Sequence, residues 1–172
     1  MPMLGLGVYD MYQKQAEQAV ETAIEIGYRL IDTASMYENE VEIGNGIKNS
    51  GIDRAELFIT SKLNNTDHGY EEALKAFDKS LQLLGQDYVD LYLIHWPIKA
   101  GRAESWKALE KIYSEGRAKA IGVANYTLPF LNELKQYILT NSKRPSQTDS
   151  NSHNKKLAKW LHKQIYLYAN NV

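Results

Sequence analysis

Short apolar segments, most of them containing β-branched or aromatic residues, recur along the chain. They lie at Met3 to Val8, Arg29 to Ile31, Leu57 to Thr60, Val89 to Ile94, Ala120 to Val123 and Ile165 to Tyr168. Short continuous apolar runs are typical of strands in a sheet that is covered on both faces. The pattern therefore predicts six strands.

Between these segments, apolar residues recur at the three- and four-residue spacing of one helix face. These sets are Ala16, Ala19, Val20, Ala23 and Ile24; Leu74, Phe77, Leu81 and Leu84; Trp106, Leu109 and Ile112; Leu131, Leu134 and Ile138; and a last set around Leu157, Trp160 and Leu161. Helical segments end at Gly27, Gly51, Gly85 and Gly116, where glycine accepts a left-handed conformation. Alternating strands and helices predict a parallel α/β sheet, either doubly wound or a (β/α) barrel.

Polar residues directly follow four successive predicted strands. They are Asp32, Lys62, His95 and Asn125, which lie 30, 33 and 30 positions apart. In a (β/α) barrel the carboxyl ends of all strands open on one rim, so these side chains are expected to converge. Taken singly, Asp32 could cap a helix, Lys62 could be a surface lysine and His95 could be a core histidine. Their shared position at strand ends favours a common functional site.

Length and composition limit the classes of protein. The 172 residues correspond to about one domain, which we expect to span residues 1–172. A formal charge of -1 gives no general attraction to nucleic acid or to anionic membranes. The chain has no Cys, which excludes disulfides and cysteine-ligated metals, and no metal site is predicted. It shows neither a long apolar span nor a signal-peptide pattern, so we expect a cytoplasmic protein.

The alternation stops near the end of the chain. Residues 141–154, NSKRPSQTDSNSHN, have no apolar run and predict a polar loop where another strand is due. A complete (β/α) barrel usually needs at least about 200 residues. The sequence therefore predicts an incomplete barrel of about six or seven strands, without the late strands and closing helices.

Several motifs in a fixed order identify a family. GYRLIDTASMYENEVEIGNGIKNSG, ITSKLNNTDHG, VDLYLIHWP and KAIGVANY resemble the aldo-keto reductases, which are NADPH-dependent (β/α) barrel enzymes. The resemblance covers Met1 to about Leu139 and resumes weakly at NKKLAKW and IYLYA. It implies reduction of aldehydes or ketones to alcohols, with catalytic residues at Asp32, Tyr37, Lys62 and His95.

These four residue types suit carbonyl reduction. A carbonyl that accepts hydride becomes an alkoxide, so the site must donate a proton and stabilise negative charge on oxygen. A tyrosine ordinarily has a pKa of about 10, so a nearby cation that stabilises its phenolate helps it to act as the acid. Lys62 suits that role beside Tyr37, Asp32 would hold Lys62 in place, and a neutral His95 would orient the carbonyl. Among 12 tyrosines, only the motif DTASMY singles out Tyr37.

The resemblance also implies binding residues. Gly7, Val8, Asn125 and Gln147 would contact the NADPH cofactor, and Tyr9 and Trp96 would line the pocket of a small carbonyl substrate. Either aromatic residue could instead be ordinary core packing. GLG at Gly5 to Gly7 is not a dinucleotide fingerprint, because no third glycine opens a helix.

Three departures from the family pattern are visible. Asn64 stands where many members have tryptophan, and Ala124 replaces a serine of the amide-binding site. The family's last portion, which supplies phosphate-binding residues and closes the barrel, has no counterpart, and the loss of charge-assisted phosphate contacts would weaken NADPH binding. A basic cluster of Lys143, Arg144, Lys155, Lys156, Lys159 and Lys163 could replace that site or form a solvated helix face.

Three hypotheses follow. The chain is a short reductase, a catalytically inactive fragment that keeps the catalytic residues, or an interaction protein whose open barrel edge pairs with another chain.

Overall fold

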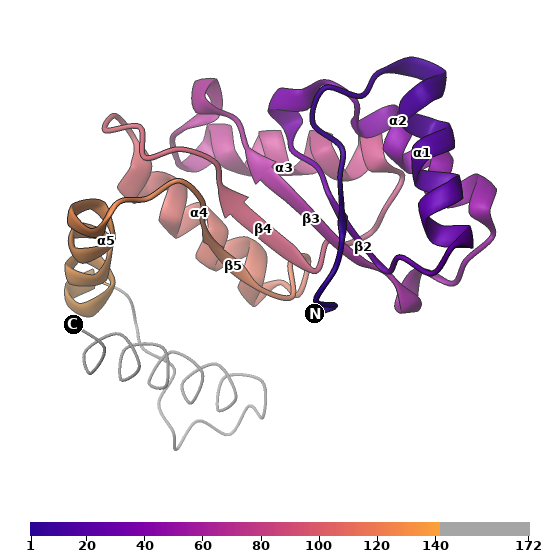
Figure 1. Cartoon of the computed structure of the whole chain (residues 1–172). Helices are drawn as coiled ribbons and strands as arrows, with labels where there is room; N and C mark the ends of the chain where they lie inside the picture. Colours follow the sequence, from indigo (N-terminus) through magenta and orange to yellow (C-terminus); the bar gives the residue numbers. More distant parts are fainter. Residues whose placement is uncertain (142–172) are drawn as a thin grey trace. The chain divides into compact units, whose positions relative to one another are not determined.

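Figure 1 shows the computed structural model of the chain, which describes residues 1–141. The chain divides into two compact units, Met1–Phe130 and Leu131–Val172. The first unit holds the sheet and four helices, and the described part of the second consists of residues 131–141 in helix α5 (Leu128–Asn141). The predicted strand at Ile165 to Tyr168, Gln147, the basic cluster and the predicted polar loop beyond Asn141 lie outside the described residues.

Five parallel strands form one sheet in the order in which they occur in the chain. They are β1 (Leu6–Gly7), β2 (Leu30–Asp32), β3 (Phe58–Leu63), β4 (Leu91–Ile94) and β5 (Ile121–Val123). The parallel α/β architecture predicted from the alternating pattern is confirmed. The first strand is shorter than the predicted Met3 to Val8, because only Leu6 and Gly7 pair with the neighbouring strand. Met3 is fully exposed and Leu4 is largely exposed, so apolar character there does not reflect burial.

The connecting helices follow the predicted periodicity. They are α1 (Gln13–Glu25), α2 (Glu40–Ser50), α3 (Tyr70–Leu84) and α4 (Arg102–Ser114). In α3, the predicted positions Phe77, Leu81 and Leu84 are buried, so one apolar face packs into the core. Gly85 ends this helix with φ 62° and hydrogen bonds back to its last turn, which is the expected role of a left-handed residue.

Successive helices pack against one another along one side of the sheet (Figure 1). Two glycines of α2 allow this approach. A Cβ atom at Gly44 would lie 2.5 Å from the carbonyl oxygen of Leu84 in α3, and one at Gly46 would lie 2.6 Å from the carbonyl oxygen of Glu17 in α1. Helices α1, α2 and α3 therefore form a continuous layer over the sheet.

The two faces of the sheet differ in composition. Ile31, Ile59, Tyr92 and Ile94 are buried beneath the helices. The opposite face carries Asp32, Thr60 and Lys62 among apolar residues, and the parallel register places Asp32 beside Thr60 and Lys62 beside Leu93. Short 3-10 turns follow two of these strands, η1 (Ser35–Tyr37) after β2 and η3 (Asn65–Asp67) after β3, and a third, η2 (Arg54–Glu56), precedes β3.

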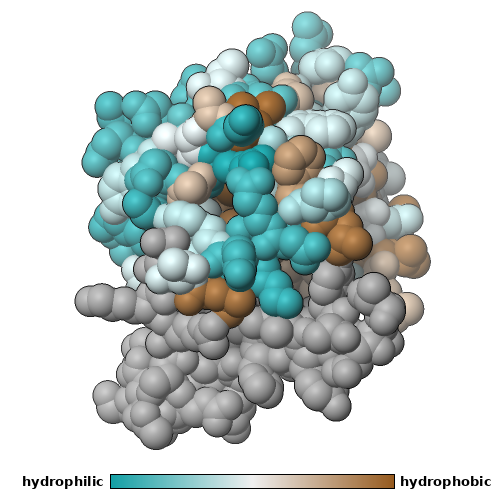
Figure 2. All heavy atoms as spheres, turned by 90° about the vertical axis from the view of Figure 1, so that its left-hand side faces the viewer, coloured by the Kyte–Doolittle hydropathy of each residue, from teal (hydrophilic) through white to brown (hydrophobic). Residues whose placement is uncertain are grey.

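The surface seen in Figure 2 is mostly hydrophilic among the described residues, with separate hydrophobic groups between the polar ones. Within residues 1–141, every helix is too short or too polar to cross a membrane.

Candidate active site

Three of the four predicted catalytic residues lie at the carboxyl ends of neighbouring strands. Asp32 is the last residue of β2, Lys62 lies near the end of β3, and His95 directly follows β4. Tyr37 reaches the same place from the η1 turn. Its hydroxyl lies 3.4 Å from the Lys62 Nζ atom, and its ring centroid lies 5.7 Å from that of His95. The structure therefore brings together residues that are up to 63 positions apart in the sequence.

Lys62 is at the centre of this group. Its side chain is only 8% exposed, and its ammonium donates hydrogen bonds to Asp32 Oδ1 at 2.5 Å and to the Thr33 carbonyl at 3.0 Å. The third polar neighbour is the Tyr37 hydroxyl, and the ammonium also lies 5.1 Å from the centroid of that ring. A buried ammonium needs such partners, because an unpaired charge is costly away from water. The arrangement directs one positive charge at the oxygen of Tyr37.

His95 is a buried imidazole whose surroundings favour its neutral form. Burial lowers the pKa of His95 below its usual range, the nearby Lys62 charge lowers it further, and the Asp32 carboxylate opposes these effects. Its Nδ1 atom is buried and makes no hydrogen bond with the described residues. A neutral imidazole can donate one hydrogen bond, so His95 can orient a polar oxygen beside Tyr37.

Two exposed aromatic side chains border this group. Tyr9 is 71% exposed, and its ring packs edge-on against Tyr37 with the centroids 5.2 Å apart. Trp96 is 44% exposed and stacks beside His95 with the centroids 6.1 Å apart. Both rings contact a predicted catalytic residue while keeping a large free surface, which suits walls of a binding pocket better than core packing.

The predicted cofactor-binding residues within the described part of the chain differ in exposure and in hydrogen bonding. Asn125 is an exposed residue with φ 59°, and its Nδ2 atom donates to the His95 carbonyl at 2.9 Å. Gly7 is exposed, and a Cβ atom there would meet no atom within 4 Å. Val8 is fully buried, so its side chain belongs to the core, and its carbonyl accepts a hydrogen bond from Asn39.

The residues that depart from the family pattern also lie on this rim. The Asn64 side chain accepts a hydrogen bond from the Asn65 backbone N–H at 2.6 Å, which caps the short η3 turn. The backbone N–H of Ala124 donates to the Ile94 carbonyl at 2.8 Å and extends the β4–β5 pairing. Asn64 therefore has a local structural role.

Sequence reasoning missed three residues that support the group. Thr33 accepts from Lys62 through its carbonyl, the Ser35 hydroxyl donates to the Lys62 carbonyl at 2.9 Å, and Asn39 joins two loops beside the site. Asn39 stands where Asn is favoured as a helix cap, but its side chain makes no capping bond, so even this local pattern does not predict its contacts. The contacts themselves come from segments that are distant in the sequence.

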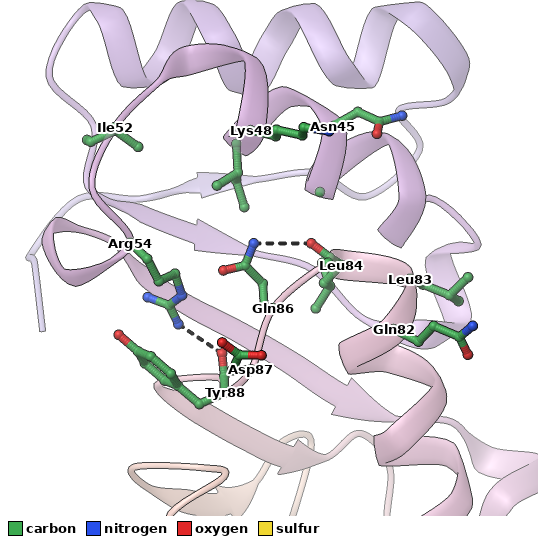
Figure 3. Close-up of a pocket in the computed structure, with 13 residues that line it drawn as sticks. Asn45, Lys48, Ile52, Arg54, Gln82, Leu83, Leu84, Gln86, Asp87 and Tyr88 are labelled. Atoms are coloured by element: carbon green, nitrogen blue, oxygen red, sulfur yellow. Dashed lines mark hydrogen bonds between the residues drawn. The ribbon is translucent and has the colours of Figure 1, made fainter.

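A cavity of about 510 Å³ lies elsewhere, between the C-terminal halves of α2 and α3. Figure 3 shows Lys48, Arg54, Gln86 and Tyr88 on its walls. Gln86 and Tyr88 precede β4, whereas His95 follows it, so this cavity lies at the opposite end of the sheet. It contains none of the predicted site residues.

The sequence is similar to those of known oxidoreductases. The chain is 58% identical over 136 residues to morphine 6-dehydrogenase of Pseudomonas putida and 53% identical over 135 residues to glyoxal reductase of Bacillus subtilis. Each match covers 78% of this chain, but only 46% and 49% of the respective relative. The chain therefore spans about half the length of these curated relatives.

Solved structures agree with these matches. A crystal structure of an aldo/keto reductase from Brucella melitensis superimposes with a TM-score of 0.77 and 48% identity, covering 82% of this chain and 55% of that one. A Bombyx mori aldo-keto reductase, crystallised with NADP, gives a TM-score of 0.74 and 31% identity, with coverages of 92% and 60%. The described sheet corresponds to part of the (β/α) barrel of these proteins. Residues 3–164 match the Aldo/keto reductase family, and the chain belongs to it.

Proposed function

We propose that this chain reduces aldehydes or ketones to alcohols with hydride from NADPH. The observation that carries the proposal is the position of the Tyr37 hydroxyl, 3.4 Å from the buried ammonium of Lys62. A cation held beside a phenol stabilises the phenolate that remains after proton transfer.

Four side chains divide the work on the substrate. Tyr37 donates its hydroxyl proton to the carbonyl oxygen as hydride reaches the carbonyl carbon, so the product is a neutral alcohol. Lys62 stabilises the tyrosinate, and Asp32 holds the ammonium at 2.5 Å. His95, neutral because burial lowers its pKa, donates a hydrogen bond that orients the carbonyl toward Tyr37.

The residues of the rim fit the nicotinamide end of NADPH, which supplies the hydride when bound. The Asn125 Nδ2 atom is engaged by the His95 carbonyl, which leaves its Oδ1 atom as an acceptor for a carboxamide N–H. Gly7 leaves open space at the end of β1. The Bombyx mori relative was crystallised with NADP, which supports the same cofactor class here. Gln147 as a second contact to the nicotinamide carboxamide, and the basic cluster as a phosphate site, are proposed only as candidates outside the described residues.

The substrate is proposed only as a small carbonyl compound. The two named relatives act on different molecules, as their names state, so neither substrate transfers to this chain. Tyr9 and Trp96 are proposed as the aromatic walls, and the polar Asn64 stands where many relatives have tryptophan. We further propose a cytoplasmic location, consistent with the lack of Cys.

Cofactor binding is the first test of this function. Titration of the purified chain with NADPH at low salt, followed by protein and nicotinamide fluorescence and repeated with NADH, should give saturable binding in the micromolar range. Aldehydes and ketones would then be assayed by loss of nicotinamide absorbance. Absence of binding at millimolar NADPH, or binding without turnover of any carbonyl compound, would contradict the proposal.

Self-association is a second candidate function. Among residues 1–141, β1 and β5 are the outer strands of the sheet, and each pairs on one side only. Unpaired edges of this kind can pair with a second chain. Sedimentation velocity over a hundredfold range of protein concentration should show a concentration-dependent dimer. A constant monomer would exclude this alternative.

A further inference from the structure

Asn39 is a fully buried amide beside the candidate active site that has no part in the proposed chemistry. It is 0% exposed and stands directly before α2. Its Nδ2 atom donates to the Val8 carbonyl at 2.8 Å and to the Met11 carbonyl at 2.9 Å. Its Oδ1 atom accepts from the Thr33 hydroxyl at 3.0 Å. The amide therefore uses both of its donor hydrogens and one acceptor position on two other segments.

These contacts are more than a helix cap. The backbone carbonyl of Asn39 accepts the hydrogen bond from the Ile43 N–H that opens α2, and its side chain makes no capping bond to that helix. The start of α2 therefore depends on backbone that any residue could provide. The side chain is left free to bind the β1–α1 loop, residues 8–12, and the end of β2.

The β1–α1 loop needs such an anchor. Asp10 in the loop and Gln13, the first residue of α1, have positive φ of 61° and 51°, a conformation that costs energy for most residues other than glycine. Tyr9 lies at the start of this loop and is 71% exposed, so burial of its ring does little to hold it. The two carbonyls that Asn39 binds, those of Val8 and Met11, bracket Tyr9 and Asp10.

The same amide connects the loop to the catalytic group. Thr33, whose hydroxyl donates to Asn39, accepts a hydrogen bond from Lys62 through its carbonyl. Tyr37 lies two residues before Asn39, and its ring packs against that of Tyr9 at 5.2 Å. A chain of hydrogen bonds therefore runs from Lys62 through Thr33 and Asn39 to the loop that carries Tyr9.

We propose that Asn39 is a positioning residue that holds the strained β1–α1 loop so that Tyr9 stands against Tyr37 and forms one wall of the substrate pocket. The role in substrate binding rests on the proposed reductase function, whereas the role in ordering the loop does not. Loss of the two Nδ2 hydrogen bonds releases the loop and moves the wall, but leaves Lys62, Tyr37 and His95 in place. The effect should therefore fall on substrate binding more than on the chemical step.

The test compares Asn39→Asp with Thr33→Val. The aspartate has the shape of the amide but places an oxygen against the Val8 and Met11 carbonyls. The valine removes only the Thr33 hydroxyl, which donates a hydrogen bond to Asn39 Oδ1. Both variants disturb one buried polar cluster, so they serve as matched changes. Hydrogen–deuterium exchange of residues 9–13 should be faster by roughly tenfold or more in Asn39→Asp alone. Equal exchange in the two variants would overturn the proposal.

Kinetics separate positioning from a general structural role. KM for an aldehyde should rise by roughly tenfold to a hundredfold in Asn39→Asp, with kcat changed by only a few fold. In a Tyr9→Ala background the same substitution should add little to KM, because the wall is already absent. A parallel loss of kcat, or fully additive effects on KM, would contradict the positioning role.

The test still gives an answer if a variant does not fold or if the wild-type chain has no activity. If Asn39→Asp does not fold, Asn39→Ser replaces it, since the shorter neutral side chain cannot reach both loop carbonyls. If neither variant folds while Thr33→Val does, Asn39 serves folding and the proposal is wrong. If the wild-type chain reduces no carbonyl compound, the proposed reductase function fails, but the exchange experiment still decides whether Asn39 orders the loop.

Discussion

Two pairs of a cation and a carboxylate lie at opposite ends of the same sheet. At the carboxyl ends of the strands, Lys62 contacts Asp32 at 2.5 Å. At the other end, Arg54 from the η2 turn contacts Asp90, directly before β4, at 2.7 Å. Both cations are largely buried, with side chains 8% and 20% exposed. Charge and burial alone therefore do not distinguish a site from a structural pair.

The Arg54 pair is bound mainly to the main chain. Arg54 donates to the carbonyls of Leu57 and Tyr88, at 2.9 and 3.0 Å, and its guanidinium lies 4.0 Å from the centroid of the Tyr88 ring. Asp90 accepts from the Ile59 N–H at 3.0 Å. These contacts join the start of β3 to the segment before β4. The pair fixes the relative position of two strands.

The Lys62 pair leaves reactive groups free of the main chain. The Tyr37 hydroxyl has Lys62 as its hydrogen-bond partner at the long distance of 3.4 Å, and His95 Nδ1 has none among the described residues. Arg54 Nε is also buried without a hydrogen-bond partner among the described residues, so an unsatisfied atom alone does not separate the two ends. The Lys62 end differs because its polar groups lie beside the exposed rings of Tyr9 and Trp96, where a ligand can complete their contacts. The two ends therefore differ in the partners of the cation. Arg54 is held by Asp90 and two main-chain carbonyls, whereas Lys62 contacts the Tyr37 hydroxyl, which can still bind a ligand.

Tyr37→Phe should have the strongest effect on turnover. Loss of the hydroxyl removes the proposed proton donor, so turnover of an aldehyde with NADPH should fall by about 10²- to 10⁴-fold. NADPH oxidation measures this effect, and NADPH affinity and the melting temperature should stay near those of the wild type. Tyr28→Phe is the matched control and should keep full turnover. A Tyr37→Phe variant with wild-type turnover would show that another group donates the proton.

The structural pair should respond in stability instead. Asp90→Ala leaves Arg54 and the Ile59 N–H without their acceptor in the interior, and loss of one partner of a buried pair typically costs about 3–5 kcal/mol. Urea denaturation followed by circular dichroism measures the free energy of unfolding. Asp78→Ala is the control, because Asp78 is 59% exposed in its pair with Arg117 and should contribute much less. Equal losses in the two variants would remove the distinction drawn for Asp90.

Asp32→Asn should affect turnover more than stability. Asp32 is 36% exposed, so its neutral replacement should destabilise the fold less than Asp90→Ala does. Turnover should nevertheless fall, because Lys62 loses the carboxylate that holds it beside Tyr37. Steady-state kinetics and urea denaturation of the same preparation give the two values. Full turnover in Asp32→Asn would show that the Thr33 carbonyl alone keeps Lys62 in position.

Much of this arrangement was predictable from the sequence. Asp32, Lys62 and His95 end successive strands in a regular strand–helix repeat, and a parallel sheet necessarily brings strand ends to one rim. Tyr37 breaks that rule, since it lies on a short turn after β2, and only the family motif identified it. The helix ends at Gly51 and Gly85 were also predictable, because their left-handed conformations, φ 67° and 62°, are local.

The missed residues depend on distant contacts. Asn39 binds carbonyls 28 and 31 positions away, and Asp90 binds the Ile59 N–H 31 positions away. A buried polar residue looks like a surface one in the sequence until its partners are known. Met3 and Leu4 show the opposite error, because they are apolar but exposed. Hydrophobic pattern thus predicts elements well and predicts neither buried hydrogen bonds nor the ends of an edge strand.

A pH dependence of stability at the Lys62 end of the sheet should be the weakest of these effects. Burial and the Lys62 charge lower the pKa of His95 in the folded chain, while in the unfolded chain it should titrate near 6.5. Below that pH the unfolded chain binds a proton that folded His95 does not, so the free energy of unfolding should fall as the pH decreases. Above it, His95 should contribute no pH dependence.

Urea denaturation at several pH values, for the wild type and His95→Asn, isolates this contribution as the difference between the two proteins. His68, whose pKa burial also lowers, and the buried Glu40, whose pKa burial raises, remain in both and cancel. The wild type should lose more stability than His95→Asn as the pH falls from 7.5 to about 5. Parallel curves would mean that folded His95 titrates like an exposed histidine, and the neutral hydrogen-bond donor at this end of the sheet would then be lost below pH 6.5.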